Sequence, residues 1–281
     1  ADAGKVLVRA STVKDVFRNA VNNEGVIKAN KVIDEGGVIS IVADDDVVST
    51  GTLEAIGGTI EIESTGAVKS LGTLKTDTFL ETGASLYLAG TAEVGLYSDI
   101  ANLDDAVTYG TGNFSGPYSD IANIIIDTDA VITLTGATTF TADSDESGTG
   151  AFTMNSGSSI VGGGYDLGIY ASEASTLRSI TGVGAFNISE KQISSNPTYT
   201  VSNDISMNSF TLNSGTFSAG ANTLTCNGNF TLSGGSFTAG TSTLILDATN
   251  GDLTFTGGGY TFNNTLFKNT SSTNDRVITM G

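Results

Sequence analysis

Hydrophobic residues alternate with polar ones along most of the chain, in short runs separated by glycine or asparagine. One clear case is the segment 209–226, whose apolar positions are Phe210, Leu212, Phe217, Ala219, Leu224 and Cys226. Alternation of this kind is typical of strands that bury one face, because successive side chains point to opposite sides of a strand. The pattern predicts an all-β chain with about three short strands in every 20 residues.

The same pattern returns every 20 or 21 residues in three separate parts of the chain. Residues 209–228 match 229–248 at a shift of 20, residues 37–57 match 58–78 at a shift of 21, and the hexapeptide YSDIAN occurs at 97–102 and again at 118–123. A fixed period of this length indicates a solenoid. We therefore predict a single-stranded parallel β-helix (β-solenoid) of about 20–21 residues per coil, in which Phe210 lies over Phe230 about 4.8 Å away along the axis.

We expect one continuous β-helix over residues 1–281, with no linker or domain boundary. Residues 1–78 form its first coils, 79–200 less regular coils with loops, and 201–281 coils rich in glycine, serine, threonine and phenylalanine. Three departures from the period predict a helical insertion at 12–24, a glycine-rich bend at 109–117 and a lengthened coil at 246–252 that places Leu232 opposite Phe255. The competing architecture is a β-sandwich or propeller, for which Asn227-Gly228 and Asn250-Gly251 would be hairpin turns.

The N-terminal segment contains three apolar strands with a recognisable order of motifs. These are GKVL at 4–7, VNNEGVIKA at 21–29 and GGVISI at 36–41. In these motifs the first 75 residues or so resemble filamentous-haemagglutinin-type secreted bacterial exoproteins. The resemblance implies a right-handed parallel β-helix, export across the bacterial envelope and service as a long adhesive or structural fibre. We expect the chain to be a processed protein or a section of a longer one.

The acidic charge is concentrated in the first half of the chain. The formal net charge is −18, and between Thr76 and Gly150 there are 12 acidic side chains and no lysine or arginine. Such a surface repels phosphate groups, which excludes nucleic acid as an expected partner. No run of 18 apolar residues is present, so we expect no membrane insertion.

The residue types expected in an enzyme's active site are scarce. Histidine is absent, which removes the commonest general base. Cys226 occupies an inward position and is expected to act as a small buried hydrophobe. Asp99 and Asp120, one coil apart, form the carboxylate pair that a glycosidase would need, but their origin in the repeated hexapeptide favours a structural ladder or a shared cation. A carbohydrate-binding module would need aromatic platforms on its outer face, for which only Tyr87, Tyr97 and Tyr118 could serve.

Calcium is the one cofactor for which the sequence offers candidate ligands. Asp143, Asp145 and Glu146 lie close together in the segment TADSDESG, and oxygen ligands suit this cation. Solvated loop residues are the other interpretation, since neither an EF-hand loop nor a calcium-binding nonapeptide repeat is present. No other cofactor is expected.

These observations together predict a non-enzymatic structural module of an extracellular fibre at a bacterial cell surface. Its expected partners are further repeats of the same chain or other copies stacked end to end, with host or surface glycans as a second candidate class. The alternative is a glycan-active β-helix, either a polysaccharide lyase or a tailspike-like hydrolase.

Overall fold

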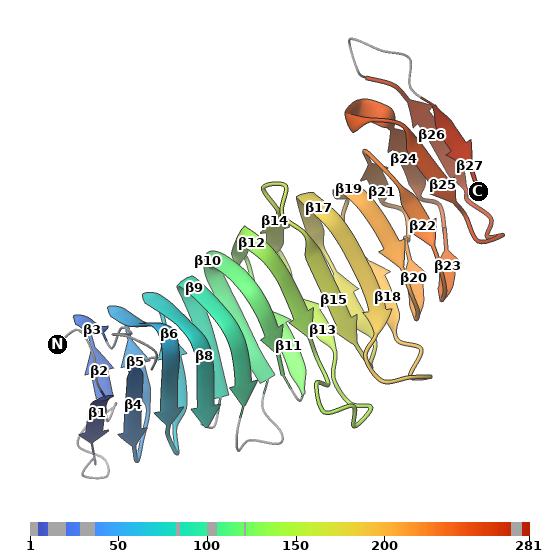
Figure 1. The fold of residues 1–281 in the computed structure, drawn as a ribbon. Helices are drawn as coiled ribbons and strands as arrows, with labels where there is room; N and C mark the ends of the chain where they lie inside the picture. Colours follow the sequence, from blue (N-terminus) through green and yellow to red (C-terminus); the bar gives the residue numbers. More distant parts are fainter. Residues whose placement is uncertain are drawn as a thin grey trace.

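The computed structural model of the 281-residue chain describes residues 5–10, 21–28, 37–82, 85–99, 106–120, 122–270 and 277–281. It is a parallel β-solenoid, as the sequence predicts, and every strand pair in the described residues is parallel. Figure 1 shows the strands stacked into an elongated rod with the two termini at opposite ends. In the part of the chain that the structure describes, the 3₁₀-helical turn η1 (Ala248–Asn250) is the one helical element.

Three faces, here named A, B and C in the order in which the chain visits them within a coil, run along the rod. Face A contains β2 (Val21–Asn23), β5 (Val47–Ser49), β7 (Ala67–Ser70), the first parts of β9 (Ser85–Asp99) and β10 (Ala106–Ser119), β11 (Asn123–Ile126), β13 (Phe152–Met154), β16 (Ser175–Leu177), β18 (Thr198–Val201), β20 (Thr216–Ser218) and β23 (Ser236–Thr238).

Face B contains β3 (Val26–Lys28), the first parts of β6 (Thr52–Glu63) and β8 (Thr73–Thr82), the middle parts of β9 and β10, the first part of β12 (Val131–Thr141), β14 (Ser159–Val161), the first parts of β17 (Ser179–Glu190) and β19 (Ile205–Leu212), β21 (Thr223–Cys226), β24 (Thr243–Asp247) and β26 (Asn264–Lys268).

Face C contains β1 (Lys5–Ala10), β4 (Val38–Ala43), the last parts of β6, β8, β9, β10 and β12, β15 (Leu167–Ala171), the last parts of β17 and β19, β22 (Phe230–Leu232), β25 (Leu253–Thr256) and β27 (Ile278–Met280).

Strand register confirms the repeat that the sequence shows. Ile39 pairs with Ile60, Leu53 with Leu74, Phe210 with Phe230, Phe217 with Phe237 and Leu224 with Leu244. The rings of Phe210 and Phe230 are stacked, with centroids 4.9 Å apart. Equivalent residues therefore lie over each other in consecutive coils, and hairpins play no part in the described structure.

Two details of the predicted register are wrong. The residue opposite Phe255 is Phe230 rather than Leu232, because η1 and the residues after it lengthen this coil by five residues rather than three. The segment 109–117 is not a bend, because β10 runs through it and pairs with β9 and β12. Small residues in this segment allow the backbone to turn the corner between faces without leaving the ladder.

The helical insertion predicted at 12–24 is wrong where the structure describes it, since Val21–Asn23 forms strand β2; residues 12–20 lie outside the described residues. Coil length varies in the middle of the chain, where Ile124 pairs with Phe152, 28 residues later. The extra residues form a loop after β12.

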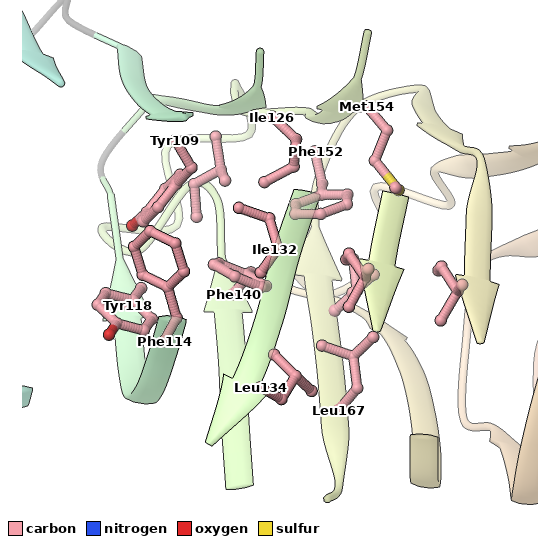
Figure 2. Close-up of a cluster of buried hydrophobic side chains, with 14 of the residues drawn as sticks. Tyr109, Phe114, Tyr118, Ile126, Ile132, Leu134, Phe140, Phe152, Met154 and Leu167 are labelled. Carbon is pink, nitrogen blue, oxygen red and sulfur yellow. The ribbon is translucent and has the colours of Figure 1, made fainter. Parts of the chain in front are cut away.

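The interior of the rod is filled by one unbroken column of apolar side chains, from Ile39 near one end to Phe255 near the other. Figure 2 shows part of it, with aromatic rings from three strands packed together. Tyr118 belongs to this cluster: it is fully buried and its hydroxyl donates to the carbonyl oxygen of Ala92 at 2.8 Å. The prediction of Tyr118 as an outer platform is therefore wrong, and burial raises the pKa of its phenol.

A column of five glycines marks the corner between faces A and B. Its members are Gly25, Gly51, Gly72, Gly90 and Gly112. From Gly51 onward, a Cβ atom added to each glycine would overlap the carbonyl oxygen of the glycine one coil earlier. Only Gly90 has a left-handed backbone conformation, so close approach of successive coils is what requires glycine at the other positions.

Candidate functional site

Three hollows in the surface lie along one corner of the rod, between faces B and C, and a fourth of about 470 Å³ lies between faces C and A beside Ser172 and Pro197. One, of about 370 Å³, lies beside β8 and β9. Two more, of about 440 Å³ and 280 Å³, lie further along and share Asn208, Ser209 and Asn227. We call the combined pair the polar groove. Its lining includes Asp166, Gly182, Ser206, Asn229 and Asp252.

Backbone hydrogen bonds across successive coils hold the walls of the polar groove in place. The Gly184 amide donates to the Tyr165 carbonyl oxygen at 2.7 Å, and the Ala185 amide donates to the Asp166 carboxylate at 2.7 Å. One coil later the Ser206 hydroxyl accepts from the Gly182 amide at 3.0 Å. Since these bonds join three coils, the groove is a fixed feature of the rod.

The floor of the polar groove contains polar groups that have capacity for a ligand. Met207 pairs with Cys226, so the residues that follow them, Asn208 and Asn227, lie at equivalent positions in consecutive coils. Within the described residues, the side-chain amide of Asn227 and the hydroxyl of Ser209 make no hydrogen bond. Both groups can donate and accept.

An exposed aromatic residue, whose own side chain is not part of the lining, lies between two residues that line the polar groove. Tyr165 lies between the lining residues Gly164 and Asp166, and 44% of its surface is exposed. The sequence analysis missed this residue because it falls in a loop between β14 and β15, away from the alternating pattern. Of the three tyrosines that were expected as platforms, Tyr118 is in the core, Tyr87 is half-buried with its hydroxyl 3.4 Å from Asp127, and the side chain of Tyr97 lies outside the described residues.

The hollow nearer the N-terminus has a different character. Ile56, with 55% of its surface exposed, lines it together with the ion pair that Lys75 makes with Glu93 at 3.0 Å. Lys75 pairs in register with Glu54 on one side and with Glu93 on the other. This alternation of charge favours the observed register of the coils, and we assign the hollow no further role.

Asp143, the first calcium candidate, is buried inside its own loop. Its carboxylate accepts hydrogen bonds from the Ser147 hydroxyl at 2.8 Å and from the Gly148 amide at 3.0 Å. Burial acts to raise the pKa of Asp143, but hydrogen bonds, with Ser172 the strongest contributor, outweigh burial and hold the pKa below its usual value. The carboxylate therefore organises the loop 142–150.

Asp145 and Glu146 also make contacts, within this loop and to a residue two coils further on. The Asp145 carboxylate accepts from the Ser147 amide at 3.3 Å, and the Glu146 carboxylate forms an ion pair with Lys191 at 2.8 Å. The described residues contain no cluster of three or more histidine, cysteine, aspartate or glutamate side chains placed to hold a metal ion. The calcium hypothesis stays untested.

Protonation of Asp143 should lower the folding stability of the protein in acid. Because its pKa is lowered in the folded state, its stabilising contribution is complete above the ordinary value of 3.8 and is lost as pH falls through the folded pKa. Asp143→Asn should lower stability at neutral pH by about 1–3 kcal/mol and flatten the pH dependence below about pH 4. Thermal unfolding between about pH 3 and pH 7 measures this. Glu173 is an exposed carboxylate on a later coil, so Glu173→Gln should leave the dependence of stability on pH unchanged. The same pH dependence in wild type and Asp143→Asn would contradict the prediction.

The remaining chemical candidates are structural where they are described. Cys226 is fully buried as expected, and burial raises the pKa of its thiol to about 11. Asp120 is buried and its carboxylate accepts from the Ala122 amide at 2.7 Å. The side chain of Asp99 lies outside the described residues, so their predicted pairing stays a prediction.

No protein-family model, curated protein or solved structure matches this chain. The resemblance to filamentous-haemagglutinin-type exoproteins therefore rests on the N-terminal motifs, and the solenoid fold is the part of it that the structure confirms. Among the described residues, no helix is long and apolar enough to cross a membrane.

Proposed function

We propose that the chain is a non-enzymatic structural module of an extracellular bacterial fibre, with an adhesin-like role. The observation that carries the proposal is the unbroken apolar column, which makes one continuous rod of the described coils. Each coil is held by hydrogen-bonded neighbours above and below it, so length can be added by adding coils. A rod of this kind suits spacing and display at a surface.

The strands at the C-terminal end of the described rod support assembly into longer objects. β27 pairs with β25 and β26 pairs with β24, each on one side only, within the described residues. Leu266, Phe267 and Met280 on these strands are exposed. A parallel edge with apolar side chains can accept another strand, which either further repeats of the same chain or a second copy would supply.

The glycan-active alternative is less well supported by the residues. A lyase needs a cationic side chain to stabilise the negative charge that develops on its substrate, and the acidic stretch from Thr76 to Gly150 has none. Of the glycosidase candidates, Asp120 is buried and accepts a hydrogen bond from the Ala122 amide, and the calcium candidates Asp143 and Glu146 make contacts of their own. A structural role therefore explains more features of the sequence than a catalytic role does.

Electron microscopy of the purified chain over a range of concentrations tests the proposal. We expect rods one solenoid wide whose length increases with concentration, and no release of reducing ends from a panel of acidic and neutral polysaccharides. Rods of one fixed length at every concentration would contradict stacking of copies. Turnover of a polysaccharide that is abolished by changing one carboxylate would contradict the non-enzymatic role.

A further inference from the structure

We propose that the polar groove at the corner between faces B and C binds a neutral polysaccharide, laid along the rod and resting against Tyr165. This proposal goes beyond the structural role and does not depend on it, because a rod could stack without binding glycan. It depends on the shape of the groove, its hydrogen-bonding groups, its charge and the exposed tyrosine.

The shape of the groove suits a chain-like ligand. Its two parts have volumes of about 440 Å³ and 280 Å³ and share Asn208, Ser209 and Asn227, so the hollow runs on from one coil to the next. Volumes of this size lie in or near the range of ligand sites, about 300–1,000 Å³. Because consecutive coils are about 4.8 Å apart, a polymer lying along the axis would pass Asn208 and then Asn227, its equivalent in the next coil.

The hydrogen-bonding groups of the groove match the hydroxyls of a sugar. A sugar hydroxyl both donates and accepts, and so do the Asn227 amide and the Ser209 hydroxyl, which make no hydrogen bond elsewhere in the described part of the chain. The Asn208 side chain is exposed at the equivalent place one coil earlier. A row of groups that both donate and accept hydrogen bonds favours a ligand with many hydroxyl groups over an apolar ligand or one with a single charge.

The charge of the groove selects against anionic ligands. Its charged lining residues are Asp166 and Asp252, and no lysine or arginine lines either part. The chain as a whole carries a net charge of −18. A uronic acid polymer, a sulfated glycan or a nucleic acid would be repelled, so a neutral polysaccharide is the ligand that fits.

Tyr165 supplies the apolar contact that a sugar ring needs. A tyrosine ring offers a flat apolar body with a polar end, and the C–H face of a pyranose can stack on it. The Tyr165 amide donates to the Gly162 carbonyl oxygen at 2.9 Å, and its own carbonyl oxygen accepts from Gly184. The backbone is thus fixed while the ring stays 44% exposed, so the platform is built before any ligand arrives.

Gly182 keeps the groove open beside this platform. A Cβ atom at Gly182 would meet nothing within 4 Å, so the residue leaves free space on the groove wall. Ser206, which binds the Gly182 amide, is likewise small. Larger side chains at these places would reduce the room for a ligand.

Affinity electrophoresis of the full chain tests the inference directly. Native gels would contain a neutral polysaccharide (β-1,3-glucan, galactomannan, dextran or hydroxyethyl cellulose) or an acidic one (polygalacturonate or alginate). We expect retardation by at least one neutral polymer and by neither acidic one. Tyr165→Ala and Asn227→Ala should each raise the dissociation constant by about fivefold or more, a loss in line with one stacked or hydrogen-bonded contact.

Matched controls separate binding from folding. Tyr260→Ala removes another partly exposed tyrosine, one that lies outside the groove, and should leave the retardation unchanged. Circular dichroism and the thermal midpoint identify any variant that fails to fold; Tyr165→Ala removes an exposed side chain and should fold. Absence of retardation in every neutral polymer, retardation by acidic polymers alone, or full retardation of both groove variants would each overturn the proposal. The electron-microscopy test of rod assembly does not depend on any of these three outcomes, so the structural role and the glycan binding can fail separately.

Discussion

Replacing Phe230 with alanine is expected to lower the free energy of unfolding by about 3–5 kcal/mol, the usual cost of deleting a buried aromatic ring. Phe230 is fully buried and its ring packs against Phe210, Phe237, Phe255 and Phe262, with centroids 4.9–6.2 Å away. The cavity left by the ring would cross the interior of the rod, because both neighbouring coils lose a partner. The stacked pairs add about 0.5–1.5 kcal/mol each beyond their burial.

Chemical denaturation combined with hydrogen exchange measures this loss and locates it. Since each coil contacts only its neighbours, protection should fall first in β19, β22 and β25 and stay unchanged in β5 and β7. Thr231→Ala, the next residue on the outer side of the same strand, should cost less than about 1 kcal/mol. A Phe230→Ala variant as stable as Thr231→Ala would show that the phenylalanine column does not hold the coils together.

Gly72→Ala is expected to be the most damaging single-methyl change at the corner between faces A and B, at about 3 kcal/mol. A Cβ atom at Gly72 would overlap backbone atoms of Gly51 and Thr50 in the preceding coil. Backbone atoms in a paired ladder cannot move aside as a flexible side chain would, so the two coils would have to separate locally. The expected loss of about 3 kcal/mol is the upper end of the usual cost of overpacking.

Gly25→Ala is the matched control, because Gly25 begins the same column and a Cβ atom there would meet nothing within 4 Å. Its effect should stay within about 0.5 kcal/mol. Thermal and urea unfolding of the two variants, prepared together, give the comparison. Equal stabilities of Gly72→Ala and Gly25→Ala would mean that the close approach of coils at this corner does not constrain the sequence.

The architecture could be predicted from the sequence because the same rule acts in every coil. A side chain that fits the interior at one level fits at the next, so Ile39 and Ile60 or Phe210 and Phe230 repeat, and the repeat reveals both the period and the inward face. Burial of alternate residues then fixes the register, because a slip by one residue would expose the whole apolar set.

Predictions failed where the spacing between coils varies. Residues 246–252 carry an insertion at a corner, and only its three-dimensional path decides that Phe230 rather than Leu232 pairs with Phe255. Tyr118 follows a stretch of glycine, serine and proline that interrupts the apolar alternation, so sequence alone did not place it inside. The glycines and the proline of 109–117 resemble a turn, but β10 continues through them around a corner, so the signature was misleading there.

The candidate site was harder to predict than the fold. Asp143, Asp145 and Glu146 stand out as acidic neighbours in the sequence, but the folded loop uses them for its own hydrogen bonds and an ion pair. The polar groove combines residues from five coils that are far apart in sequence, and asparagine and serine are too common in this chain to attract notice. Its hollow depends on how the strands bend between faces B and C.

The direction of the ladder hydrogen bonds determines how such a rod would respond to a pull on its two ends. These bonds run between coils, along the long axis, so tension loads them one rung after another instead of shearing many at once. Each coil of about 20 residues that peels away would release up to about 70 Å of extended chain. A tether built from these coils would lengthen in steps under load and absorb work at every step before its anchorage failed.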